Sequence, residues 1–281
     1  MFRYTNHVCR KCFLQNDPFH KVTLNEDGVC SLCAKPAPEE ARRDWDALEK
    51  RFAAHLDRVR GTRPYEGLIM MSGGKDSALV GILCKKACSN TVGILLPCAT
   101  TQNYGSDTDD AIRVAEQYGI AYRTVDLSET RGALVAALEK AGVELNNAAV
   151  SNIAPRLRMT ALYAVAAAEH RLVAGTGNRS EAYVGYFTKW GDGAHDFNPI
   201  DDLTVTEIYE FLRWLKAPEC VIEKAPSAGL FDGQTDEGEM GFTYKELDTY
   251  LGGGKIDDAV LEKIQRMHAK SEHKRRSILT F

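Results

Sequence analysis

The sequence predicts an α/β protein built on a doubly wound parallel sheet, with a small cysteine-rich module at its N-terminus. The first observation is that short apolar runs alternate with longer helical patterns through most of the 281 residues. Buried parallel strands are short continuous apolar runs, and each is followed by a helix that crosses back over the sheet. The second observation is that four of the eight cysteines form two CxxC pairs near the start of the chain.

These two patterns divide the chain into a cysteine-rich module, a linking helix and a main α/β domain, at residues 1–37, 38–62 and 63–281. The linking helix is predicted from apolar residues that recur on one helical face, namely Trp45, Leu48, Phe52 and Leu56. We expect it to join the module to the main domain.

In the main domain, four apolar runs are expected to be strands, at residues 67–71, 91–96, 121–127 and 172–174. Helices are expected after or between them, at residues 76–87, 106–118, 131–140 and 154–170. Ser106 and the acidic residues after it suit the start of a helix, since they cap it and complement its dipole. A glycine-rich hinge at 251–255 precedes a C-terminal helix. This strand–helix alternation favours a parallel sheet.

Charge and hydropathy exclude several classes of protein. The net charge of -4 is unfavourable for a protein that binds nucleic acid non-specifically. No apolar run approaches the roughly 18–20 residues that span a bilayer. The chain also reaches Cys9 and Cys12 before any apolar stretch, which is unlike a secretory signal. We therefore expect a cytoplasmic protein with neither membrane nor nucleic-acid partners.

The two CxxC pairs are Cys9 with Cys12 and Cys30 with Cys33, with 17 residues between the pairs. In a reducing compartment this spacing is typical of four thiolates around one structural Zn²⁺ ion. A metal would hold together a ribbon too short to have its own core. An iron–sulfur cluster and a redox pair are the alternatives.

A phosphate-binding loop is predicted at the junction of the first strand and its helix, in the sequence MSGGKDS at 71–77. Its two glycines let the backbone approach an anion, and the helix N-terminus supplies N–H groups and a positive dipole. Ser72 and Ser77 add hydroxyls, and Lys75 adds a positive charge. A glycine turn that only caps the helix is the alternative. The spacing is neither GxxxxGK[ST] nor GxGxxG. It resembles the SGGxDS loop of the ATP-pyrophosphatase superfamily, which implies cleavage of ATP between its α and β phosphates.

A second dense region, residues 173–196, combines a glycine-rich turn after a strand with charged and aromatic residues. Asp76 and Glu181 offer the hard oxygen ligands that Mg²⁺ prefers beside a polyphosphate. Lys189 is suited to a carboxylate or a phosphate. Flat faces for an aromatic ring are offered by Tyr186, Phe187 and Trp190. So many glycines, charges and aromatics together favour a ligand-binding loop over a core segment.

The motifs GTGNxSE, GYFTKxGDGAxD, NPIxDL, PSAxLxxGQTDExExG and HKR resemble those of the ammonia-dependent NAD synthetase family. The resemblance runs from about residue 66 to residue 276, and it implies a Rossmann-like fold of the ATP-pyrophosphatase type. It implies that deamido-NAD is adenylated on its nicotinate carboxylate and that ammonia then displaces AMP. It also implies a homodimer.

Carried over by position, the family's ATP site falls on Met70, Met71, Ser72, Gly73, Gly74, Lys75, Asp76, Ser77, Thr176 and Ser227. Its Mg²⁺ ligands fall on Asp76 and Glu181, which with Lys189 are the expected catalytic residues. Its deamido-NAD contacts fall on Arg156, Lys189, Asp196, His273 and Lys274.

Two departures from the family keep alternatives open. Val205 stands where the family often has an ATP-contacting lysine, and we hypothesise that Lys75 partly replaces that charge. The N-terminal cysteine pattern is similar to that of N-acetyl-sugar amidotransferases, so adenylation and amidation of another carboxylate, such as that of a sugar, is an alternative.

A tRNA-thiolating enzyme, with Cys98 or Cys220 as sulfur carrier, is a further alternative. Both cysteines lie in ordinary apolar surroundings, and the acidic charge balance is unfavourable for tRNA. A nucleotide-binding module without catalysis is the last alternative, against which the acidic pair and Lys189 argue. No glutaminase domain fits the assigned chain, so we expect nitrogen to arrive as free ammonia or from a separate glutaminase.

Overall fold

The computed structural model describes residues 24–26, 28–30, 43–60, 66–70, 72–98, 105–227 and 235–276, with only the backbone for 59–60 and 66–70. Four strands within these residues form one parallel sheet: β1 (Glu66–Met70), β2 (Val92–Leu95), β3 (Ala121–Thr124) and β4 (Arg171–Val173). Their order across the sheet is β3-β2-β1-β4. The predicted α/β class with a parallel sheet is confirmed.

The order of the strands determines where a ligand can bind. The chain runs outward from β1 to β2 and β3, and then crosses back to place β4 on the other side of β1. In open parallel sheets, ligands bind outside the carboxyl ends of the strands, where the strand order reverses. That point lies between β1 and β4, whose pairing aligns Leu68 with Val173.

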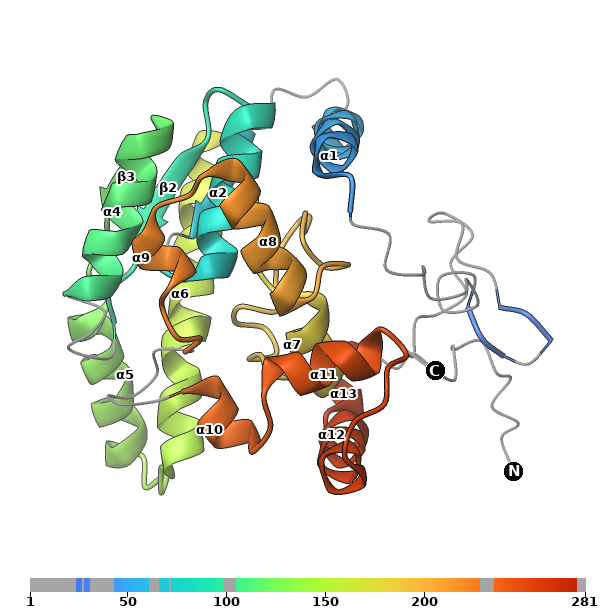
Figure 1. Ribbon diagram of the computed structural model, residues 1–281. Coiled ribbons are helices and arrows are strands. Elements are labelled where there is room, and N and C mark those ends of the chain that lie inside the picture. Colours follow the sequence, from blue (N-terminus) through green and yellow to red (C-terminus); the bar gives the residue numbers. More distant parts are fainter. Residues whose placement is uncertain are drawn as a thin grey trace.

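The two faces of the sheet are covered by different helices, as Figure 1 shows. Side chains alternate between the faces along β2, because successive residues of a strand point in opposite directions. Leu95 joins a core with residues of α1, α2, α4 and α8, whereas Ile94 joins a core with residues of α6. These helices are α1 (Trp45–Arg60), α2 (Lys75–Ala87), α4 (Ser106–Tyr118), α8 (Val205–Leu215) and α6 (Asn147–Glu169).

The remaining helices are shorter or lie further from the sheet. They are α5 (Ser128–Lys140), α7 (Arg179–Val184), α9 (Glu219–Ile222), α10 (Asp236–Met240), α11 (Tyr244–Leu251), α12 (Asp258–Lys270) and α13 (Glu272–Arg275). Helices α10 to α13 lie together at one side of the molecule in Figure 1. A third apolar cluster joins α7, α8 and α10–α12 through side chains that include Val184, Val205 and Leu247.

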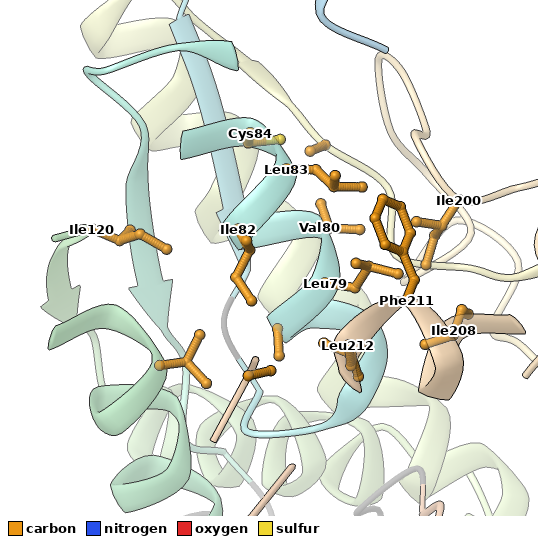
Figure 2. Close-up of a cluster of buried hydrophobic side chains, with 14 of the residues drawn as sticks. Leu79, Val80, Ile82, Leu83, Cys84, Ile120, Ile200, Ile208, Phe211 and Leu212 are labelled. Carbon is orange, nitrogen blue, oxygen red and sulfur yellow. The ribbon is translucent and has the colours of Figure 1, made fainter. Parts of the chain in front are cut away.

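Helix α2 is the most deeply buried helix of the fold. Figure 2 shows Leu79 and Leu83 of this helix on the side of Phe211 of α8, and Ile82 on the side of Ile120. A helix buried on this scale is held firmly, because each of its large side chains loses favourable contacts if it moves. The loop that opens α2 is therefore supported by the main core.

Helix α1 confirms the predicted apolar face, since Trp45, Phe52 and Leu56 are buried and Leu48 packs against them. The Trp45 ring stacks on Phe211 with 4.7 Å between centroids. The helix predicted as a link therefore packs into the main core, whereas the division into domains stays a prediction.

Three elements differ from the predicted boundaries by three residues or more, and one of them is α5, which begins at Ser128 rather than at residue 131. Helix α6 begins at Asn147 rather than at residue 154, because the Asn146 side chain caps it by accepting from the Ala149 amide at 2.9 Å. Pro155 then lies inside the helix rather than near its start. Strand β3 ends at Thr124 rather than at 127, although the Val125 amide still donates to Leu95.

The predicted metal module lies mostly outside the described residues, and so do Cys9, Cys12 and Cys33. Cys30 is buried, and Leu24 pairs with it in an isolated antiparallel bridge. The zinc site stays a prediction. Among the described helices, none has the length and apolar character needed to cross a membrane.

Candidate active site

A cavity of about 850 Å³ lies at the carboxyl ends of three strands. Ser72, Leu96 and Thr176, which follow β1, β2 and β4, all line it. The wall also includes residues from α6, from the segment 185–188 and from 224–227. Its position matches the point where the strand order reverses, and its size suits a nucleotide-sized ligand.

The loop between β1 and α2 forms the floor of this cavity. Gly74 is the N-cap residue of α2, and Gly73 has a positive φ of 75°. A Cβ atom on Gly73 would lie 2.1 Å from the Asp107 carbonyl oxygen, so only glycine fits this close approach. The Ser77 hydroxyl donates to the Gly74 carbonyl at 3.1 Å and lies 3.0 Å from the Ser72 hydroxyl. The predicted anion-binding loop therefore has the expected helix-start geometry.

Two carboxylates predicted to act together do meet at this loop. Lys75 donates from Nζ to Asp76 Oδ2 at 2.7 Å, and the same Nζ lies 3.7 Å from Glu181 Oε1. The side chains of Lys75, Asp76 and Glu181 are only 5%, 16% and 15% exposed. A buried cation thus lies between two mostly buried acids.

Asn178 fixes the orientation of both acids. Its side-chain amide donates to Asp76 Oδ1 at 3.0 Å, and its backbone amide donates to Glu181 Oε2 at 3.3 Å. Asn178 also caps α7, since its side-chain oxygen accepts from the Glu181 amide at 2.9 Å. One oxygen of each acid is therefore held by Asn178, and the other faces Lys75.

Burial and charge oppose each other in this cluster. Burial alone would lower the pKa of Lys75, but the charges of Asp76 and Glu181 outweigh it and raise that pKa. Burial and the Asp76 charge raise the pKa of Glu181 well above its ordinary value, although Lys75 opposes this. Asp236, which accepts from the Tyr244 hydroxyl at 3.0 Å, adds further negative charge nearby.

The acids suit Mg²⁺ in chemical type, since they are hard oxygen donors aimed at one point beside the predicted phosphate-binding loop. Among the described residues, no group of three or more His, Cys, Asp or Glu side chains is placed to hold a metal. The protein thus offers two carboxylates, a number that fits Mg²⁺ because this ion keeps waters and takes phosphate oxygens as its other ligands.

Three further predicted residues line the cavity, namely Thr176, Ser227 and Lys274. Lys274 donates from Nζ to the carbonyls of Gly185 at 2.7 Å and Phe187 at 2.6 Å. Burial lowers the pKa of Lys274. This lysine therefore ties the C-terminal segment to the loop that carries the predicted aromatic residues.

Three of the other predicted acceptor residues form a chain of contacts beside the cavity wall. Lys189 donates from Nζ to the His273 carbonyl at 2.8 Å, and Arg156 donates to the Lys189 carbonyl at 3.3 Å. None of the three is among the described residues that line the cavity.

Of the residues predicted to bind ATP, Met71 lies outside the described residues, and Met70 is described by its backbone alone.

The carboxylate of Asp196, another residue predicted to bind the acceptor, is hydrogen-bonded within the protein. It accepts from the Val173 amide at 2.7 Å and from the Tyr163 hydroxyl at 3.2 Å, and it too lies outside the wall of the cavity. These bonds anchor the segment after β4. A contact with the acceptor stays a prediction.

Sequence reasoning missed several residues of the site. Asn178, Asp236 and Tyr244 surround the two acids, and Lys224 donates to Asp107 and Asp110, both at 2.7 Å, at the cavity wall. The signal for Asn178 was present, because Asn followed three residues later by Glu is a helix-start pattern. The other contacts join distant segments and have no local signature.

The cysteines proposed as sulfur carriers do not have the surroundings of reactive thiols. Burial raises the pKa of both Cys98 and Cys220, which disfavours the nucleophilic thiolate. Neither lines the cavity formed by the described residues. This geometry argues against sulfur transfer through either cysteine.

Comparison with known proteins gives consistent matches to this arrangement. The family model described as NAD synthase matches residues 50–278. The NH3-dependent NAD(+) synthetase of Carboxydothermus hydrogenoformans is 46% identical over 238 residues, covering 84% of this chain and 97% of that protein. The structure of an NMN synthetase from Francisella tularensis superimposes with a TM-score of 0.79 at 36% identity, covering 85% of this chain and 99% of that one. The NH3-dependent NAD synthetase from Campylobacter jejuni has a TM-score of 0.69 at 26% identity, with 85% and 100% covered.

Proposed function

The chain belongs to the NAD synthase family, and from this premise we propose that it makes NAD from deamido-NAD, ATP and ammonia, releasing AMP and pyrophosphate. The observation that carries the proposal is the meeting of Asp76 and Glu181 at the phosphate loop, on the wall of a nucleotide-sized cavity. That arrangement provides for charge neutralisation during transfer of an adenylyl group.

In the first step, a carboxylate oxygen of the nicotinate attacks the α-phosphorus of ATP, and the bond to the bridging oxygen of pyrophosphate breaks. We assign ATP binding to the loop residues 70–77 with Thr176 and Ser227. Asp76 and Glu181 would hold Mg²⁺, which neutralises phosphate charge when bound. The backbone amides at the start of α2 would stabilise the departing pyrophosphate.

In the second step, ammonia attacks the carbonyl carbon of the adenylate, AMP leaves with the carbonyl–oxygen bond pair, and a proton is released. No protein nucleophile is needed, so the enzyme contributes mainly positioning and electrostatics. We assign acceptor binding to Arg156, Lys189, Asp196, His273 and Lys274. Lys274 lines the cavity, and Lys189, which the family resemblance makes catalytic, lies in the contact chain beside it.

A second acceptor is favoured by one comparison. The solved structure with a TM-score of 0.79 is an NMN synthetase, whose product is the mononucleotide amide. Amidation of nicotinate mononucleotide would use the same adenylation chemistry and the same phosphate loop. The two acceptors differ only in the adenylate half of the dinucleotide.

The decisive experiment incubates the protein with ATP, Mg²⁺ and ammonium, together with deamido-NAD or with nicotinate mononucleotide. We expect AMP, pyrophosphate and NAD in equal amounts with deamido-NAD. A higher kcat/KM with the mononucleotide would move the proposal to the second acceptor. AMP release that is independent of either acceptor would overturn both and would leave another carboxylate, such as that of a sugar, as the substrate.

We also propose a homodimer that takes ammonia either free or from a separate glutaminase. Apolar side chains are exposed along β3, α5 and α6, and they include Tyr122, Val125, Leu134 and Tyr163. No side chain of α5 is buried within the described chain. Light scattering should give a dimeric mass, and Leu134→Glu should lower it, whereas a monomeric wild type would contradict the proposal.

The zinc site is a separate proposal that rests on the spacing of Cys9, Cys12, Cys30 and Cys33. Elemental analysis of the purified protein should find one zinc per chain. Cys9→Ser with Cys12→Ser should remove it. Iron in place of zinc would favour a cluster instead.

A further inference from the structure

The Lys75 side chain occupies the point at which the two acids converge. Its Nζ atom lies 2.7 Å from Asp76 Oδ2 and 3.7 Å from Glu181 Oε1. The same atom lies 5.4 Å from the centre of the Tyr244 ring, whose hydroxyl donates to Asp236. Lys75 is 6% exposed, so its charge is screened from water and balanced mainly by these acids.

Asn178 makes the convergence a fixed feature rather than a chance contact. It holds Asp76 Oδ1 and Glu181 Oε2, the two oxygens that do not face Lys75. Asn178 is fully buried and also caps α7, so it cannot shift without breaking the start of that helix. The two inner oxygens, Asp76 Oδ2 and Glu181 Oε1, therefore remain aimed at a single small volume.

A divalent cation bound by Asp76 and Glu181 would need these same two oxygens. The ammonium group and the metal carry the same sign of charge, so they cannot share a site of this size without strong repulsion. Lysine is suited to give way, because its ammonium is a compact charge on a flexible stem. Lys75 lines the cavity, so a released ammonium has space near the phosphate loop.

We propose that Lys75 is a built-in cation that neutralises Asp76 and Glu181 until a divalent metal displaces it. On displacement, the ammonium turns from the two inner oxygens toward the part of the cavity where the polyphosphate of ATP binds. The acids thus face a cation both before and after the metal arrives, and the ammonium charge stays within the site. This inference rests on the metal site of the proposed function.

The cost of removing Lys75 shows why such an arrangement is needed. Without its cation, the cluster would retain Asp76, Glu181 and Asp236 close together and mostly buried. Buried like charges destabilise a fold unless they are paired or protonated. A variant without the cation should therefore depend on added metal for part of its stability.

The test measures metal binding and stability without ATP or acceptor, so it does not depend on catalysis. Mn²⁺ binding is followed by electron paramagnetic resonance in the full-length protein and in Lys75→Met and Lys75→Gln. We expect both variants to bind Mn²⁺ about tenfold more tightly than wild type, because the competing charge is gone. Their Tm should be lower without metal and should rise more than that of wild type when Mn²⁺ or Mg²⁺ is added.

Lys86→Met is the matched control, because it removes the same charge from the same helix at a lysine paired with Glu49. It should leave the affinity for Mn²⁺ unchanged. Unchanged or weaker Mn²⁺ binding in both Lys75 variants would overturn the proposal. Failure of both variants to recover a folded state at any metal concentration would also overturn it, since the metal should replace the missing charge.

Failure of the Lys75 proposal can be distinguished from failure of the proposed function. If deamido-NAD is not the acceptor, the Lys75 variants should still bind Mn²⁺ more tightly. If NAD is formed but Mn²⁺ affinity does not respond to Lys75, the proposed function stands and only the displacement fails.

Discussion

The two ends of the candidate site are built in different ways. The inner end consists of Lys75, Asp76, Asn178 and Glu181, which are buried or mostly buried and contact one another through side chains. The outer end consists of Arg156, Lys189 and His273, which are joined through backbone carbonyls. Of these, Arg156 and His273 are exposed.

This difference indicates which end can adapt to a ligand. Charges fixed in a buried environment act on a reacting phosphate without first having to reorganise. A side chain at the surface can change its rotamer at little cost when an acceptor arrives. We therefore expect changes at the inner end to affect chemistry and stability, and changes at the outer end to affect acceptor binding.

The largest effect is expected from Asp76→Asn at the inner end. The amide keeps the shape of the side chain but removes a charge that the proposed Mg²⁺ site requires. We expect kcat for NAD formation to fall about 10²–10³-fold, with a raised requirement for Mg²⁺. Steady-state kinetics at several Mg²⁺ concentrations measure this, and a kcat within about threefold of wild type would contradict the assignment.

The second prediction concerns the backbone of the inner end. Gly73→Ala places a methyl group 2.1 Å from the Asp107 carbonyl at a positive φ, so the loop must distort. We expect the free energy of unfolding to fall by about 2–4 kcal/mol, together with ATP affinity. Urea denaturation measures the first quantity.

Gly132→Ala provides the control for Gly73→Ala. Gly132 lies inside α5, and nothing lies within 4 Å of the position that its Cβ would take. This change should stabilise the protein by about 0.5–1 kcal/mol, since alanine favours helix. Equal effects at the two glycines would show that the close approach to Asp107 is unimportant.

A smaller effect is expected at the outer end from Lys189→Met. It removes a cation assigned to the acceptor but leaves the phosphate loop unchanged. We expect KM for deamido-NAD to rise about tenfold and kcat to fall by less than in Asp76→Asn, while KM for ATP changes little. Lys140→Met on α5 is the control and should leave both KM values unchanged. An unchanged kcat would contradict the assignment of Lys189 as a catalytic residue and would leave it a binding residue for the acceptor.

The smallest effect is expected at a contact between α12 and α7. His268 of α12 contacts the Tyr183 carbonyl of α7 at 2.7 Å, and burial lowers the pKa of His268. The folded state thus favours the neutral ring, while the unfolded chain takes up a proton near pH 6.5. The contribution of neutral His268 to the free energy of unfolding is therefore present above pH 6.5 and is lost as the pH falls below it.

Urea denaturation at pH 7.5 and pH 5.5 tests this linkage. Relative to His268→Asn, the wild-type free energy of unfolding should be lower at pH 5.5 than at pH 7.5. The comparison is made between the two proteins because carboxyls with a raised pKa, such as Glu181 and Asp201, act in the opposite direction in both. His195, whose pKa is also lowered by burial, accounts for part of the remaining slope. An identical slope in the variant would show that His268 is not responsible.

The sequence by itself determined the parallel α/β sheet and the family, which the NAD synthase match confirms. It also predicted the glycine-rich loop that opens α2, whose phosphate-binding role stays a proposal. It also paired Asp76 with Glu181. The sheet and the loop follow from local patterns, because strand and helix periods and a glycine-rich helix start are properties of short segments. The pairing of Asp76 with Glu181 came instead from the ligand preference of Mg²⁺ and from the family resemblance.

Only the tertiary structure decided that Lys75 lies between those acids, that Asn178 holds both, and that Asp196 is bonded to Val173 and Tyr163. The start of α6 was also settled there, since Asn146 caps it and the helix begins at Asn147, seven residues before the predicted start at 154. Contacts across the fold depend on how α2, α7 and β4 pack against one another. The sequence of a short segment does not specify which distant segment will pack against it.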